Sequence, residues 1–96
     1  MQAEARVPTQ RGSHYIKVLL RHFSHRITVE FNETQGVANF PFGHLDIYAE
    51  ADQLVLKIKA EDAEGFSRIK DVVGGHLEEF AYRGETIKVN WVDVTA

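Results

Sequence analysis

The sequence predicts a two-layer α+β sandwich in which one antiparallel sheet carries two helices on one face, in the order β-α-β-β-β-β-α-β. Two segments place apolar residues at helical spacing, and several shorter runs alternate apolar and polar residues as half-buried strands do. Glycine, proline or aspartate separates most of these runs. A 96-residue chain with 44% hydrophobic residues can form one modest core, so residues 1–96 are expected to be a single domain.

The first two elements are an extended segment at residues 3–7 and an amphipathic helix. Thr9 or Ser13 is a candidate N-cap for this helix, which is expected to run to Ser24 or His25. Its buried stripe is expected to contain Tyr15, Ile16, Leu19, Leu20 and Phe23.

Four strand-like runs follow the helix, at residues 27–32, 37–42, 44–51 and 54–60. Pro41 cannot donate a ladder hydrogen bond, which predicts that the second of these strands lies at a sheet edge or ends in a bulge. Gly43 permits the turn into the third strand, and Asp52-Gln53 is expected to form a tight hairpin connection to the fourth.

The second helix is expected to begin after Asp62, a favourable N-cap, and to end at Arg83-Gly84. A last strand at residues 86–92 then follows. The apolar stripe of the helix contains Phe66, Ile69, Val73, Leu77 and Phe80. Residues expected to be largely buried across the fold include Leu19, Phe31, Leu56, Phe80 and Trp91.

Gly74 and Gly75 lie inside the second helix, where each glycine costs about 0.8–1.0 kcal/mol relative to alanine. Some gain should offset this cost. Close packing of the first helix, or of a second subunit, against this flank is favoured over a kink that opens space for a ligand.

Charge is distributed unevenly along the chain. Between Glu4 and Glu30 there is no acidic residue, although the net charge is −3. This asymmetry indicates an anion-binding surface, a segment that docks on an acidic partner, or pairing with the second helix, since residues 61–83 contain six acids and three bases. The basic segment contains Arg6, Arg11, Lys17, Arg21 and Arg26, together with His14, His22 and His25.

Composition limits the function classes. The acidic net charge argues against broad nucleic-acid binding, and the lack of cysteine excludes thiolate chemistry and disulfides. No apolar run approaches the roughly 20 residues of a membrane span, and the N-terminus lacks the apolar core of a signal peptide. The expected location is therefore the cytoplasm, without a membrane or nucleic-acid partner.

His22 and His25 stand three residues apart, a spacing that could bring two imidazoles near one metal ion if the helix continued that far. Arg21 and Arg26 flank the pair and disfavour a divalent cation, and no complete metal motif is present. The sequence therefore favours surface histidines over a metal site.

His76 lies beside the apolar stripe of the second helix. It is expected to be half-buried and hydrogen-bonded to a backbone carbonyl or to Glu79. The functional alternative is a polar group that points into a pocket between helix and sheet. Similarly, Phe42 either plugs the turn at residues 40–44 or lines the mouth of a ligand site.

The sequence contains no catalytic signature. Ser13, Ser24 and Ser67 lack a nucleophile-elbow or triad context, and there is no Gly-rich phosphate loop. A binding domain is therefore favoured over an enzyme, and no cofactor is assigned.

Several short motifs are spread along the chain from about Ala5 to Trp91. They are Arg21-His22-Phe23, Val29-Glu30-Phe31, Phe40-Pro41-Phe42-Gly43, Leu54-Val55-Leu56, His76-Leu77-Glu78-Glu79-Phe80-Ala81 and Trp91. Together they resemble a bacterial family known only as domain of unknown function 2218. The resemblance implies a TATA-binding-protein-like topology, a name that describes a fold and not DNA binding. It also implies an association with iron, since members often accompany siderophore-uptake genes.

The leading hypothesis is a binding module for an anionic or iron-related small molecule. Arg21, His22, His25 and His76 are its candidate site residues, with Phe42 as an apolar wall. The alternative is an interaction or homodimerisation module. In it, either the basic helix docks a protein partner or a flank of small residues on the second helix forms a dimer. That flank contains Ala63, Ser67, Gly74 and Ala81.

Overall fold

The computed structural model describes residues 1–94 and contains a six-stranded antiparallel sheet in the order β2-β3-β4-β5-β1-β6. The predicted α+β class and chain order are confirmed, whereas the likeness to a TATA-binding-protein topology stays a prediction. Along the chain the elements are β1 (Gln2–Pro8), α1 (Gly12–Phe23), β2 (Thr28–Phe31), β3 (Gln35–Phe40), β4 (Gly43–Ala49), β5 (Gln53–Lys59), α2 (Ala63–Glu79) and β6 (Val92–Val94).

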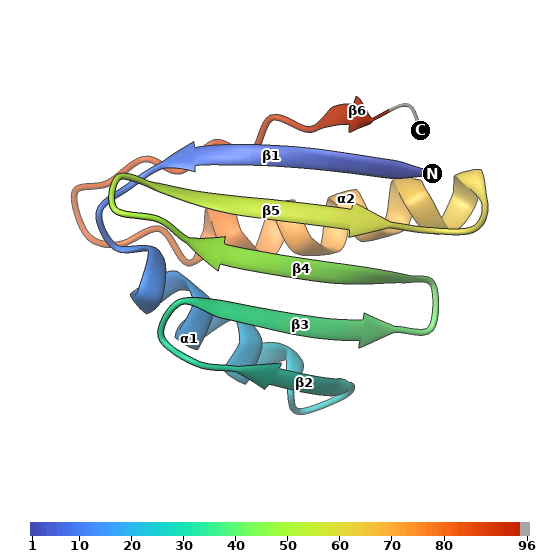
Figure 1. Cartoon of the computed structure of the whole chain (residues 1–96), viewed down its shortest axis with the longest axis horizontal. Helices are drawn as coiled ribbons and strands as arrows, with labels where there is room; N and C mark the ends of the chain where they lie inside the picture. The colour runs from blue at the N-terminus through green and yellow to red at the C-terminus, as the bar shows by residue number, and fades with distance from the viewer. Residues whose placement is uncertain (95–96) are drawn as a thin grey trace.

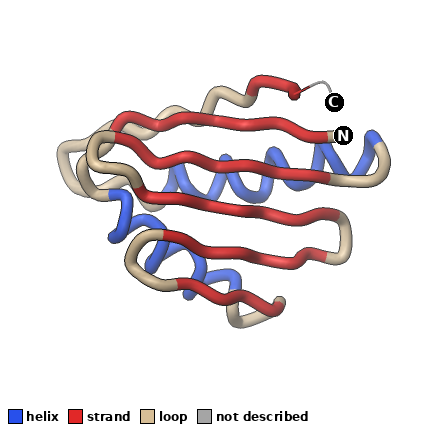
Figure 2. The backbone as a smooth tube through the Cα atoms, in the orientation of Figure 1, coloured by secondary structure: helices blue, strands red, loops and turns tan. Residues whose placement is uncertain are grey.

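Both helices lie on the same face of the sheet, as Figure 1 shows. α1 packs against β2, β3 and β4, and α2 packs against β4 and β5. The tube in Figure 2 shows the opposite face of the sheet free of helices. Because side chains alternate along a strand, that open face carries polar residues such as Arg6 and Lys57, while their neighbours face the helices.

The core lies between the helices and the sheet. Leu19 and Leu56 have no exposed surface, as predicted, and Phe80 and Trp91 are partly buried against the core. The prediction for Phe31 is wrong, since 38% of its surface is exposed. Phe31 lies on the edge strand β2 opposite Gly36, so it has no neighbouring strand on its outer side and no side chain across from it.

The two helix starts differ in how they are capped. Asp62 is the N-cap of α2, as predicted, and its carboxylate accepts a hydrogen bond from the Gly65 amide at 2.7 Å. Neither Thr9 nor Ser13 caps α1; its N-cap position is Arg11, without a side-chain capping bond. The Thr9 hydroxyl instead accepts from the Arg11 amide two residues on, a local bond that competes with capping.

Both helices end earlier than predicted. α1 ends at Phe23, and α2 ends at Glu79 with Phe80 as its C-cap. Gly84 therefore does not terminate α2. It adopts a φ of 83° in a later turn, where the Glu85 amide bonds to the Tyr82 carbonyl.

Two strand predictions are also wrong in part. Pro41 does not mark an edge, because β3 lies between β2 and β4 and Pro41 follows it in the turn. Residues 86–91 are not in a strand, and the last strand is β6, which pairs with β1. The apolar residues of 86–91 nevertheless face the core, because Ile87 is buried while Val89 and Trp91 pack against it.

Gly74 is explained by close packing, and the residues packed on it belong to the segment that follows α2 and not to α1. A Cβ atom at Gly74 would lie 3.1 Å from the Trp91 indole nitrogen and 3.6 Å from the Val89 side chain. At Gly75 a Cβ atom would meet nothing within 4 Å. The two glycines therefore differ, since close packing excludes a larger side chain at Gly74 but not at Gly75.

Candidate functional site

Two candidate histidines from different helices come into contact. The rings of His22, in the last turn of α1, and His76, in α2, have centroids 4.7 Å apart with an interplanar angle of 36°. Phe80 packs edge-on to His22, with centroids 5.3 Å apart. We call the surface formed by His22, His76 and Phe80, together with Arg21, which precedes His22 in the chain, the histidine corner.

The orientation of His76 is fixed by its own helix. Its Nδ1 lies 2.6 Å from the Val72 carbonyl oxygen, and because a carbonyl can only accept, Nδ1 is the donor. His76 is half-buried and bonded to a backbone carbonyl, as predicted. This bond leaves Nε2 as the ring nitrogen that is able to meet a ligand.

Arg21 and His25 are exposed, and they do not form one helical face with His22. Because α1 ends at Phe23, His25 lies in the following turn, where its amide bonds to the His22 carbonyl at 3.4 Å. The helical spacing that suggested a shared metal therefore does not apply. Within residues 1–94 there is no group of three or more histidine, cysteine or acidic side chains arranged to hold a metal ion.

A row of aromatic rings connects the histidine corner to Phe42. Phe23 lies 5.6 Å from the ring of His76 and 5.0 Å from that of Phe40, and Phe40 lies 5.2 Å from Phe42. Such edge-to-face and tilted pairs add about 0.5–1.5 kcal/mol each beyond the area they bury. The row thus joins His22 and His76 to Phe42 by packing, with Phe42 at its far end, and it includes neither Arg21 nor His25.

Phe42 lines an open hollow of about 790 Å³ between the β3–β4 turn and the first turn of α2. The Arg68 guanidinium lies 4.5 Å from the centroid of the Phe42 ring. The four other candidate residues do not line this hollow. Its cations, the Met1 ammonium, Lys59 and Arg68, are balanced by the carboxylates of Glu61, Asp62 and Glu64, so its charge does not favour an anion.

The basic helix does not pair with the acidic helix. In the part of the chain that the structure describes, the ion pairs join Lys57 to Glu4, Lys70 to Asp93 and His44 to Asp46. None of these pairs joins a cation of α1 to an acid of α2. The self-pairing explanation of the charge asymmetry is therefore unsupported.

A second polar cluster escaped the sequence analysis. Tyr15 is fully buried, and its hydroxyl donates to the Glu85 carboxylate at 2.5 Å while accepting from the Tyr82 amide at 2.7 Å. The Thr9 hydroxyl also bonds to this carboxylate, at 2.9 Å. These residues are up to 76 positions apart, and helical spacing marked Tyr15 only as an apolar core residue.

The cluster shifts the acidity of both of its ionisable members. Burial, followed by the hydrogen bond to Glu85, raises the pKa of the Tyr15 hydroxyl. The hydrogen bond from Tyr15 lowers the pKa of the Glu85 carboxyl, with smaller contributions from Thr9, Arg11 and His14. Both shifts favour the hydrogen-bonded pair of a neutral tyrosine and an ionised carboxylate.

Comparison with known proteins gives a family and a fold. A family model described as "Uncharacterized protein conserved in bacteria (DUF2218)" matches residues 4–92. The NMR structure of PA4090 from Pseudomonas aeruginosa matches with a TM-score of 0.77 and 22% sequence identity, covering 95% of this chain and 94% of that one. No curated protein matches the chain. In residues 1–94 no helix has the length and apolar character needed to cross a membrane.

Proposed function

The chain belongs to the DUF2218 family of bacterial proteins, and we propose that it is a binding module for a small anionic molecule. The histidine corner is the proposed site. The observation that carries this proposal is the contact between His22 and His76, which brings two imidazoles from separate helices together. Arg21, the residue before His22 in α1, is exposed.

Each side chain of the corner has a chemical role in this proposal. The Arg21 guanidinium supplies a permanent charge and paired donors that match a carboxylate or a phosphate. The imidazoles of His22 and His76 donate to the anion when protonated, and Phe80 forms an apolar wall beside them. An iron-related ligand would enter as an anionic complex, an identity that rests on the family resemblance alone.

The alternative is an interaction module in which exposed cations of α1, such as Lys17 and Arg21, dock on an acidic protein surface. The dimer version would have to use a part of the small-residue flank of α2 other than Gly74. The flank of α2 at Gly74 is already covered by Val89 and Trp91 of the same chain.

Imidazole NMR distinguishes these proposals. Titration with inorganic phosphate is expected to give saturable shifts of the His22 and His76 ring resonances, with haem and Zn²⁺ as parallel titrants. Saturable shifts with Zn²⁺ alone would mean that the site binds a metal ion and not an anion. No saturable shift with any titrant would favour the interaction module. Shifts confined to His14 and His44 would contradict the choice of site, since neither residue belongs to the corner.

Charge reversal tests the role of Arg21. Arg21→Glu is expected to weaken phosphate binding about tenfold or more, because a charge-assisted hydrogen bond contributes about 1.5–3 kcal/mol. The free energy of unfolding should change by no more than about 0.5 kcal/mol, since the side chain is exposed. The affinity is measured by calorimetry at two salt concentrations, and the variant should also show the weaker salt dependence.

Arg6→Glu is the matched control, because Arg6 is an exposed arginine on the open face of the sheet. It should leave phosphate affinity unchanged. A drop of several degrees in the melting temperature of Arg21→Glu, with unchanged affinity, would mean that the charge of α1 serves stability and not binding.

A further inference from the structure

Residues 80–91 form a segment without helix or strand that connects the end of α2 to β6. Figure 1 shows this segment in orange and red, turning back at the end of α2 and returning along the molecule towards the edge of the sheet. We call residues 80–91 the strap. Because it takes no part in the sheet ladder, side chains hold most of it in place.

The second half of the strap covers one flank of α2. Ile87 is buried in the core, while Val89 and Trp91 pack over Gly74. One polar contact supports this packing, since the Val89 amide donates to the Glu78 carboxylate at 2.9 Å. An alanine at position 74 would press on Trp91, so the glycine makes room for the strap.

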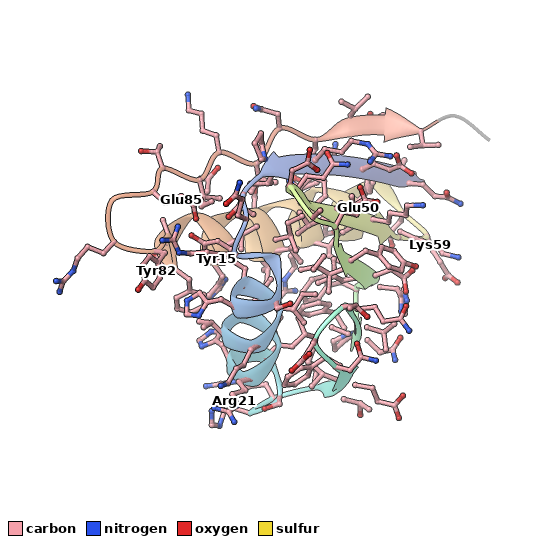
Figure 3. The ribbon with its side chains drawn as sticks, turned by 60° about the vertical axis from the view of Figure 1, so that its left-hand side comes forward. Tyr15, Arg21, Glu50, Lys59, Tyr82 and Glu85 are labelled. Carbon is pink, nitrogen blue, oxygen red and sulfur yellow. The ribbon has the colours of Figure 1, made fainter. Side chains whose placement is uncertain are left out.

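The first half of the strap is held by the partly buried cluster around Glu85. The Glu85 carboxylate accepts hydrogen bonds from Tyr15 of α1 and from Thr9, which follows β1. The Tyr82 amide of the strap donates to the same Tyr15 hydroxyl. Figure 3 shows Tyr82 and Glu85 beside Tyr15 at the start of α1, with Arg21 at its other end.

Charged groups around the cluster also favour the ionised carboxylate. The Arg11 guanidinium lies 4.2 Å from the centroid of the Tyr82 ring, and the His14 ring packs edge-on to Tyr82 at 5.3 Å. Both Arg11 and His14 attract the charge of Glu85. The strap is therefore fastened at one carboxylate by groups from α1 and from the connection between β1 and α1.

We propose that the strap opens and closes as a unit over the Gly74 flank of α2, with the Glu85 carboxylate as its latch. Segments with few main-chain bonds to the rest of a fold open at a lower free energy than the sheet does. The closed strap keeps the apolar flank of α2 away from water. Opening exposes that flank and Trp91, and it leaves the helices and the sheet in place.

The latch has a defined pH range. Because the pKa of Glu85 is lowered in the folded chain, its contribution is complete above the ordinary value of 4.5 and is lost as the pH falls through the lowered value. The pKa of Tyr15 is raised, so its contribution is complete below 10.0 and is lost as the pH rises through the raised value. The contribution of the Glu85 latch is therefore complete at neutral pH and is lost at acidic pH, below 4.5.

Trp91 is the only tryptophan of the chain and lies in the strap, so it reports opening directly. Glu85→Gln is expected to raise the exchange rates of the Tyr82 and Val89 amides, which bond to side chains outside the strap, about tenfold at neutral pH. It should also increase acrylamide quenching of Trp91. The amides of β4 and β5 should keep their exchange rates. Below pH 4.5 the native protein should approach the quenching of the variant, whose own quenching should change little.

Glu30→Gln is the matched control, because Glu30 is an exposed carboxylate on β2. Equal effects in Glu85→Gln and Glu30→Gln would overturn the latch. An equal increase of exchange in β4, β5 and the strap would overturn opening as a separate unit. If Glu85→Gln does not fold, Tyr15→Phe is the second variant. It keeps the Glu85 charge but removes the hydroxyl that donates to this carboxylate, and the same results are expected.

Discussion

Leu56→Ala is expected to lower the free energy of unfolding by about 2–5 kcal/mol, the usual cost of removing a buried leucine side chain. Leu56 lies near the middle of β5, has no exposed surface, and faces the helices with Ala5 and Ile47 on its two neighbouring strands. The sheet backbone cannot collapse into the space left behind, so a cavity remains in the core. Urea unfolding measures this loss.

Lys57→Ala is the control for the core substitution, because Lys57 is the next residue and points to the open face. Its side chain is 48% exposed and lies 3.6 Å from the Glu4 carboxylate, a surface pair that contributes about 0–1 kcal/mol. Similar losses in Leu56→Ala and Lys57→Ala would show that the assignment of the two faces of β5 is wrong.

Two glycines of α2 are expected to respond to alanine with opposite signs. At Gly65 a Cβ atom would lie 2.6 Å from the Phe42 carbonyl oxygen, so the β3–β4 turn has to move away from the helix. We expect Gly65→Ala to cost about 1–3 kcal/mol, as other overpacked substitutions do. At Gly75 the space is open, and alanine should stabilise the protein by about 0.8–1.0 kcal/mol through its higher helix propensity.

Thermal and urea unfolding of the two variants under one set of conditions decides the prediction. The comparison is controlled internally, because the substitution and the helix are the same. Stabilisation by Gly65→Ala would mean that the turn yields without cost, and destabilisation by Gly75→Ala would mean that something covers that side of α2.

The candidate site was only partly accessible from the sequence. Helical periodicity placed His76 beside the core stripe, and its bond to a backbone carbonyl confirms that interpretation. The same periodicity could not show that His22 would meet it, because the contact depends on how α1 and α2 pack against each other. Phe42 was grouped with the histidines, yet it lines a hollow of its own at the end of the sheet.

Local chemistry determined what the sequence could predict by itself. The apolar stripes at helical spacing, the alternation along the strands and the Asp62 cap each depend on residues close in sequence, and together they identify the α+β class and the element order. The errors in α2 and the last strand have the opposite cause. The spacing of apolar residues in 80–91 suits a helix end or a strand. Packing against the rest of the fold instead holds this segment without helix or strand.

Tertiary structure alone decided the strap and its latch. Glu85 is held by Tyr15 and Thr9, residues 70 and 76 positions away, and no local pattern encodes a hydrogen bond over that distance. Gly74 shows the same dependence, because the need for glycine there comes from the contact with Trp91 and not from the helix that contains Gly74. Short-range periodicity therefore determined which elements form, whereas long-range contacts determined which side chains meet and where chemistry can take place.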